Sequence, residues 1–292
     1  MRLVFVHGRS QGRKDPTELL LSWQNALTRG LELAGCPALD TSVEVRMPFY
    51  GRRLDELTEA GPAPGDVVRR GPGNTVDPVE GEFVLDIAHR AGITDEEISA
   101  EAGEAVVARG PQNWPFVLAA GRLVSRRIPW LGRELLPLLT TDVAAYLTRP
   151  HVTKEINGLV KADIGEGPVV MVGHSLGSVV AYWVLRTELP AVDVRLFLTV
   201  GSPLGIDVVK RYLPVPLGMP GGVRKWLNAA DRRDPVALFS RLDRDVFPAD
   251  IENVDDIHNP EDNPHGIVGY LSDRIVCTRL SEALSVSAAN GG

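Results

Sequence analysis

The chain contains little cysteine and has no excess of positive charge. Cys36 and Cys277 are its two cysteines among 292 residues, and nothing in their spacing suggests a metal or redox site. We expect each thiol to be buried. A reducing cytoplasm is the simpler interpretation, although two cysteines also allow one disulfide. The formal net charge of -7 argues against a polyanionic partner, so we expect no nucleic acid to bind.

Long apolar runs are also missing. Residues 1–6 form a strand-like run rather than a charged start followed by a long apolar segment, which predicts no signal peptide. The apolar stretch at 114–139 is interrupted by arginines, so it does not predict an integral membrane span. A composition of 44% hydrophobic and 24% charged residues is typical of globular chains. The length favours one core with an insertion over two equal domains.

The most informative segment is residues 173–177, which read Gly-His-Ser-Leu-Gly between an apolar run at 169–172 and a helical run at 179–185. A strand that reverses sharply into a helix strains its turn residue, and the positions two before and two after it must be nearly free of side chain. The two glycines meet that requirement. Ser175 is therefore interpreted as a nucleophile, with the Leu176 N–H opening a helix whose positive end favours developing negative charge. The alternative is an ordinary turn in which Ser175 caps the helix.

A nucleophilic serine needs a base, and two histidines follow Ser175 in the chain. His265 stands on a loop tip directly ahead of the amphipathic run 267–284, a placement that suits a mobile base. His258 lies in a polar loop and is the alternative. His174 adjoins the serine, and we interpret it as a packing residue or a neighbour of the pocket wall.

The acid that orients the base is expected in the loop after the strand-like run 223–227. Asp231 and Asp234 compete there. Pro235 follows Asp234 and holds it extended, so its carboxylate can project toward a histidine. We favour Asp234 over Asp231, and either residue could instead be a turn or N-cap aspartate.

With these residues in place, the order Ser175, Asp234, His265 and the glycine-flanked turn resemble the α/β-hydrolase superfamily, in its lipase and esterase branch. The chain start adds to the likeness, because its first strand-like run ends in His7-Gly8. That dipeptide is similar to the His-Gly loop that supplies the second oxyanion-hole N–H in the family. The resemblance implies that the N–H groups of Arg9 and Leu176 form the oxyanion hole.

The resemblance implies an α/β fold with a mostly parallel central sheet and helices on both faces. The core would comprise residues 1–50 and 140–292, and residues 51–139 would be an inserted cap or lid. The implied activity is hydrolysis of a carboxylic ester, lipid-like or otherwise small, through an acyl-enzyme, with no cofactor or metal. An acyltransferase or thioesterase using the same residues and a non-catalytic hydrolase-like binding protein are the alternatives. The oligomeric state stays open.

Periodicity predicts the remaining organisation. The stretch 17–34 predicts a helix that covers the sheet, and the alternation at 42–48 predicts a half-buried strand. Residues 51–113, rich in glycine and proline, predict an irregular insertion. The stretch 114–139 predicts two helices, which either cap the pocket and receive an acyl chain or pack on the core.

Two further segments are expected near the pocket. Ser202 lies in the loop that follows a strand-like run at 195–200, but it cannot replace the nucleophile, because Pro203 after it has no N–H to hold an oxyanion. We interpret this loop as a pocket wall or a plain turn. Tyr50 is expected either to border the pocket or to lie on the surface.

Overall fold

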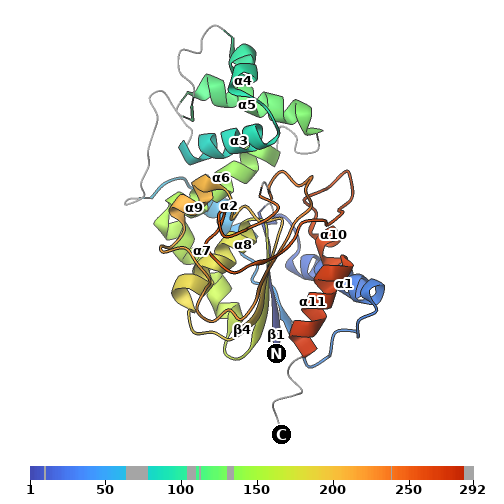
Figure 1. Cartoon of the computed structure of the whole chain (residues 1–292). Coiled ribbons are helices and arrows are strands. Elements are labelled where there is room, and N and C mark those ends of the chain that lie inside the picture. Colours follow the sequence, from blue (N-terminus) through green and yellow to red (C-terminus); the bar gives the residue numbers. More distant parts are fainter. Residues whose placement is uncertain are drawn as a thin grey trace. The chain divides into compact units, whose positions relative to one another are not determined.

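The centre of the protein is a six-stranded sheet in which every strand pair is parallel (Figure 1). The computed structural model describes residues 1–9, 11–63, 78–103, 110–111, 113–129, 135–237 and 239–285. The strand order is β2-β1-β3-β4-β5-β6. Their bounds are Arg2–Val6 for β1, Glu44–Arg46 for β2, Val169–His174 for β3, Val194–Val200 for β4, Trp226–Ala229 for β5 and Glu252–Val254 for β6. The predicted α/β class with a mostly parallel sheet is confirmed.

Helices cover both faces of this sheet (Figure 1). One face carries α1 (Pro16–Ala34), α10 (Ile267–Leu271) and α11 (Arg274–Ser285), and the other carries α8 (Leu176–Trp183), which continues into the π-helical turn η2 (Val184–Glu188). The run 267–284 thus forms two helices. Helix α1 has strong end signals: the Asp15 side chain accepts from two N–H groups of the first turn, and Gly35 adopts a left-handed C-cap with φ 68°.

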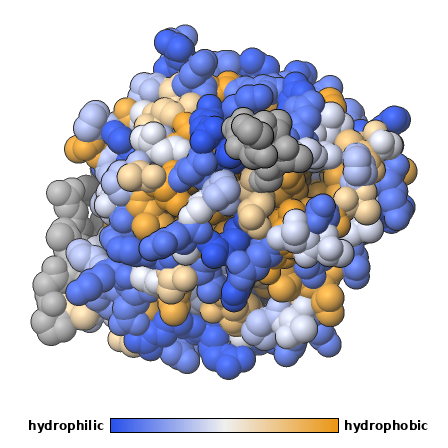
Figure 2. All heavy atoms as spheres, turned by 90° about the horizontal axis from the view of Figure 1, so that it is seen from below, coloured by the Kyte–Doolittle hydropathy of each residue, from blue (hydrophilic) through white to orange (hydrophobic). Residues whose placement is uncertain are grey.

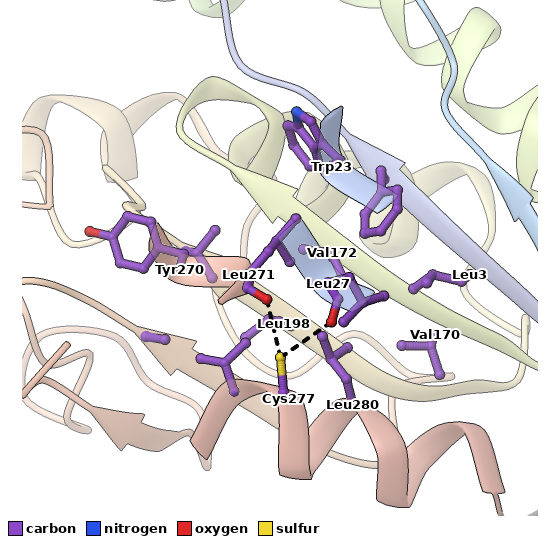
Figure 3. Packing of buried hydrophobic residues seen from close by; sticks show 14 of the residues in the cluster. Leu3, Trp23, Leu27, Val170, Val172, Leu198, Tyr270, Leu271, Cys277 and Leu280 are labelled. Atoms are coloured by element: carbon purple, nitrogen blue, oxygen red, sulfur yellow. Dashed lines mark hydrogen bonds between the residues drawn. The ribbon is translucent and has the colours of Figure 1, made fainter. Parts of the chain in front are cut away.

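The apolar core on the α1 side is built from alternate residues of the strands and from the facing stripes of α1, α10 and α11. Figure 3 shows Leu3, Val170, Val172 and Leu198 of the sheet against Trp23, Leu27 and Leu280 of the helices. Cys277 lies inside this cluster, where burial raises the pKa of its thiol to about 12. Cys36 is a free thiol as well, but it is only half-buried, so the expectation of two buried thiols is wrong for Cys36.

The chain divides into two compact units. The first comprises residues 1–53, 155–205 and 213–292, and holds the sheet. The second comprises residues 54–154 and 206–212. Its helices are α3 (Pro78–Arg90), α4 (Asp95–Ala102), α5 (Trp114–Arg127), α6 (Leu135–Thr148) and α9 (Asp207–Tyr212), and the helices α2 (Gly51–Glu59) and α7 (Pro150–Ile164) run across the boundary.

The segment 51–113 is more regular than its glycine and proline content suggests. It contains α2, α3 and α4 among its described residues. The acidic stretch at 95–97 is the first turn of α4, which begins with a capping box formed by Thr94 and Glu97. Capping and packing against α5 compensate for weak helical periodicity here, which explains why the pattern alone predicted an irregular segment.

Within the described residues, no helix combines the length and the apolar character needed to cross a bilayer. The face seen in Figure 2 mixes hydrophilic and hydrophobic residues, as the surface of a folded protein usually does.

Candidate active site

Ser175 occupies a strained turn between β3 and α8. Its backbone has φ 55° and ψ -130°, and it is the one non-glycine residue with positive φ in the described part of the chain. A Cβ at Gly173 would lie 2.6 Å from the Cα of Ser178, and one at Gly177 would lie 2.1 Å from the carbonyl oxygen of Val6. Both glycines are therefore required by close packing of the elbow. The Ser175 side chain makes no cap hydrogen bond, so the alternative role of a helix-capping serine is not what the structure contains.

Hydrogen bonds connect this turn to β4 and to the first turn of α8. The Ser175 N–H donates to the Val200 carbonyl at 3.1 Å, and the Ser175 carbonyl accepts from the N–H and hydroxyl of Ser178 at 2.9 and 2.6 Å. The Ser178 and Ser202 hydroxyls are 2.7 Å apart. The loop after β4 is thus part of the support of the elbow. Ser202 itself is 2% exposed and belongs to this support.

Asp234 and His265 form a hydrogen-bonded pair. Asp234 Oδ2 lies 2.7 Å from His265 Nδ1, and the Asp234 side chain is fully buried. The N–H groups of Val236 and Ala237 donate to Asp234 Oδ1 at 2.9 and 3.4 Å, as expected for an aspartate held by the turn after it. His265 directly precedes Gly266, the N-cap of α10, and retains 11% exposure of its side chain.

The alternative residues lie elsewhere. The Asp231 carboxylate binds the guanidinium of Arg233 at 2.6 Å and accepts the N–H groups of Arg233 and Asn259, both at 2.8 Å. These bonds make Asp231 a structural residue that ties two loops together. His258 is exposed to solvent, whereas the structure pairs His265 with the carboxylate of Asp234.

Parallel pairing brings the segments that follow β1, β3 and β4 to one edge of the sheet. Val6 is in register with Gly173, and His174 with Val200, so the residues that follow β1, β3 and β4 emerge together. Gly201, with φ 55°, lies against the acid–base pair: a Cβ there would be 2.9 Å from Asp234 Oδ2 and 3.0 Å from His265 Nδ1. The two-residue segment Gly201-Ser202 therefore touches both the pair and the support of the elbow.

The nucleophile candidate and the base candidate are linked through other residues, His174 and the segment Gly201-Ser202, and not by a direct bond. The Ser175 hydroxyl makes no hydrogen bond to the His265 ring within the described part of the chain. Catalytic hydrogen bonds are often long in the absence of substrate and tighten only in the reacting complex. Ser175 is 3% exposed, so its hydroxyl lies beneath the molecular surface.

His174 connects the elbow to the base. Its Nε2 lies 2.9 Å from the His265 carbonyl, which can only accept, so Nε2 carries the proton. The two rings pack at 4.6 Å between centroids and 33° between planes. Burial lowers the pKa of His174 well below its usual value and keeps the ring neutral. This residue was expected only to pack or to line a wall, and a sequence carries no signal for a bond across 91 positions.

The segment after β1 lies against Ser175. A Cβ at Gly8 would be 2.9 Å from Ser175 Cβ and 3.4 Å from its Oγ. His7 is fully buried beneath this segment, where desolvation lowers its pKa to about 4. Its Nε2 accepts the Tyr50 N–H at 3.2 Å, which leaves a proton on Nδ1 for the Gly8 carbonyl at 2.6 Å.

Tyr50 completes the support of this segment. Its ring stacks on His7 at 4.1 Å, and its hydroxyl donates to the His7 carbonyl. Tyr50 is fully buried, so of the two alternatives expected for it, a pocket border or a surface position, the surface position is wrong. Arg9, the next residue after Gly8, is buried. Leu176 is the first residue of α8, so its N–H has no partner within the helix.

The described residues include no group of three or more histidine, cysteine, aspartate or glutamate side chains arranged to hold a metal ion. No family model, curated protein or solved structure matches this chain.

Proposed function

We propose that the protein is a serine hydrolase that cleaves a carboxylic ester through an acyl-enzyme. The observation that carries the proposal is the strained Ser175 elbow beside a buried Asp234–His265 pair, with Gly201-Ser202 in contact with both. Strain of this kind at a polar residue persists only where the surroundings enforce it, and it presents the side chain for chemistry.

In the proposed reaction, Ser175 Oγ attacks the ester carbonyl while His265 Nε2 takes the hydroxyl proton. Asp234 keeps the Nδ1 proton in place, which leaves Nε2 free to accept, and stabilises the imidazolium that forms. His265 then donates its proton to the departing alkoxide, and the alcohol leaves. Water, deprotonated by His265, then attacks the acyl-enzyme. The bond to Ser175 Oγ breaks, His265 returns the proton to this oxygen, and the carboxylic acid leaves.

The oxyanion of each tetrahedral intermediate would lie between the N–H of Leu176 and the N–H of Arg9. The contact of Gly8 with Ser175 supports this assignment, because it places the segment that leads to Arg9 beside the attacking oxygen. The Gly8 carbonyl and the Arg9 N–H belong to one planar peptide group and point in opposite directions. The bond from His7 to this carbonyl therefore also orients the Arg9 N–H.

Substrate entry requires movement, because Ser175 is nearly inaccessible in this structure. The insertion expected at residues 51–139 is the proposed cap, and exposed apolar side chains on α5 are its candidate contacts for an acyl chain. A small or lipid-like ester is therefore the proposed substrate class.

A fluorophosphonate probe tests the proposal directly. We expect the probe to label the wild-type protein, and S175A to remain unlabelled, because the probe phosphonylates only an activated serine. D234N and H265Q are expected to lower hydrolysis of p-nitrophenyl acetate by at least about a thousandfold while folding normally. Equal labelling of wild type and S175A would reject the assignment of the nucleophile. Addition of an alcohol acceptor distinguishes hydrolysis from acyl transfer, since a transferase would divert product from free acid to a new ester.

A further inference from the structure

The Asp234 carboxylate accepts more than the bond to His265. Oδ1 accepts the N–H groups of Val236 and Ala237, and Oδ2 accepts from His265 Nδ1 at 2.7 Å and from the Tyr270 hydroxyl at 2.8 Å. The oxygen that faces the base is therefore shared between two donors.

The direction of the Tyr270 bond follows from its second partner. The Asp231 N–H lies 3.1 Å from the same hydroxyl and can only donate, so the tyrosine oxygen accepts there and its single proton goes to Asp234. Tyr270 is fully buried, and burial with the adjacent Asp234 charge raises the pKa of its hydroxyl well above the usual value. The group therefore stays a protonated donor.

The ring of Tyr270 is anchored in the core of the protein. It lies on α10 beside Leu271, and Figure 3 shows its hydroxyl pointing away from the aliphatic side chains of the cluster. The hydroxyl is thus the polar end of a core residue, fixed in place by packing around the ring and by the Asp231 backbone.

We propose that Tyr270 is a positioning residue of the acid–base pair, whose hydroxyl fixes the Asp234 carboxylate toward His265 and shares the negative charge of Oδ2. The inference rests on the proposed function for its catalytic consequence, but the hydrogen-bond geometry on which it depends can be tested without any substrate.

Loss of the hydroxyl has a predictable electrostatic effect. With Tyr270 removed as a donor, Oδ2 keeps more negative charge for His265 and holds the protonated imidazole more strongly, so the pKa of His265 should rise. The other ionisable groups nearby are His174 of β3, which packs on His265, and Asp231 with its partner Arg233. His7 and Lys14 lower the pKa of His174 through electrostatic repulsion. All of them are the same in wild type and variant.

The test compares Y270F with Y182F. Tyr182 is a matched control: it is also fully buried, and its hydroxyl donates to the Gly218 carbonyl at 3.1 Å and accepts the Gly218 N–H at 3.2 Å, with no bond to the acid–base pair. The titration of His265 is followed by the NMR signal of its Cε1 proton, assigned by its disappearance in H265Q. The pH dependence of kcat for p-nitrophenyl acetate is measured on the same proteins.

We expect Y270F to raise the titration midpoint of His265 by roughly half a pH unit or more and to move the acidic limb of the kcat profile in the same direction. We expect kcat to fall about tenfold with KM unchanged, and Y182F to leave both midpoints in place. Incorporation of 3-fluorotyrosine at position 270, a stronger donor that preserves the ring, should lower the midpoint instead, and it serves if Y270F fails to fold.

An unchanged His265 midpoint in Y270F or in the fluorinated protein overturns the inference, as does an equal displacement in Y182F. Absence of esterase activity in the wild type would refute the proposed function alone, because the NMR titration still reports on the Tyr270 bond.

Discussion

Replacing Gly201 by alanine tests whether the loop after β4 sets the geometry of the acid–base pair. Gly201 has φ 55°, and an added Cβ would lie 2.9 Å from Asp234 Oδ2, 3.0 Å from His265 Nδ1 and 3.1 Å from His265 Cε1. The first contact is closer than real Cβ atoms come and the other two are tighter than most, so the pair must shift by a few tenths of an ångström. We expect kcat for p-nitrophenyl acetate to fall roughly 3- to 10-fold, because a displacement of about 1 Å can cost about 100-fold in rate and the shift here is a few tenths of that.

Alanine at a positive φ also strains the backbone, and G35A controls for that effect. Gly35 has φ 68°, close to the value at Gly201, but an added Cβ there meets nothing within 4 Å. We expect both variants to lose about 1–2 kcal/mol of unfolding free energy from left-handed strain, measured by urea denaturation. Only G201A should lose activity. Wild-type kcat in G201A, or an equal loss in G35A, would refute the reasoning.

Two further predictions concern the support of the site and the proposed cap. His7 is neutral when folded, with a pKa near 4 against 6.5 unfolded, so its contribution to stability is complete above pH 6.5 and is lost as pH falls toward 4, by about 3 kcal/mol. H7N cannot titrate, and its unfolding free energy should depend less steeply on pH over that window; identical slopes would contradict the assignment. Trp114 and Leu118 are 39% and 41% exposed and lie one turn apart on α5, and the second prediction replaces both by glutamine. The ratio of kcat/KM for p-nitrophenyl octanoate to kcat/KM for the acetate should then fall roughly tenfold. The control L33Q, at an exposed residue of α1, should leave this ratio unchanged. A constant ratio in the double variant would mean that this face of α5 receives no acyl chain.

Several core elements and the individual candidate site residues could be predicted from the sequence alone, because each prediction depends on interactions between residues close together in the chain. The glycines two before and two after Ser175 reflect steric demands within five residues, and the structure shows the contacts that impose them. The helix at 17–34 and the strand at 42–48 correspond to α1 and β2, since amphipathic and alternating patterns arise from one buried face. Pro235 after Asp234 likewise indicated an extended, projecting aspartate.

Only the tertiary structure decided how those candidates combine. Asp231 and Asp234 are three residues apart in one loop, and the loop before α10 brings His265 to the carboxylate of Asp234. Asp231 instead binds Arg233, two residues along the same loop. The bond of His174 to the His265 carbonyl and the role of Tyr270 were not predicted, because their partners come from segments far along the chain. Local sterics act between near neighbours and leave a trace in the sequence, whereas hydrogen bonds between distant segments exist only after the sheet has aligned its strand ends.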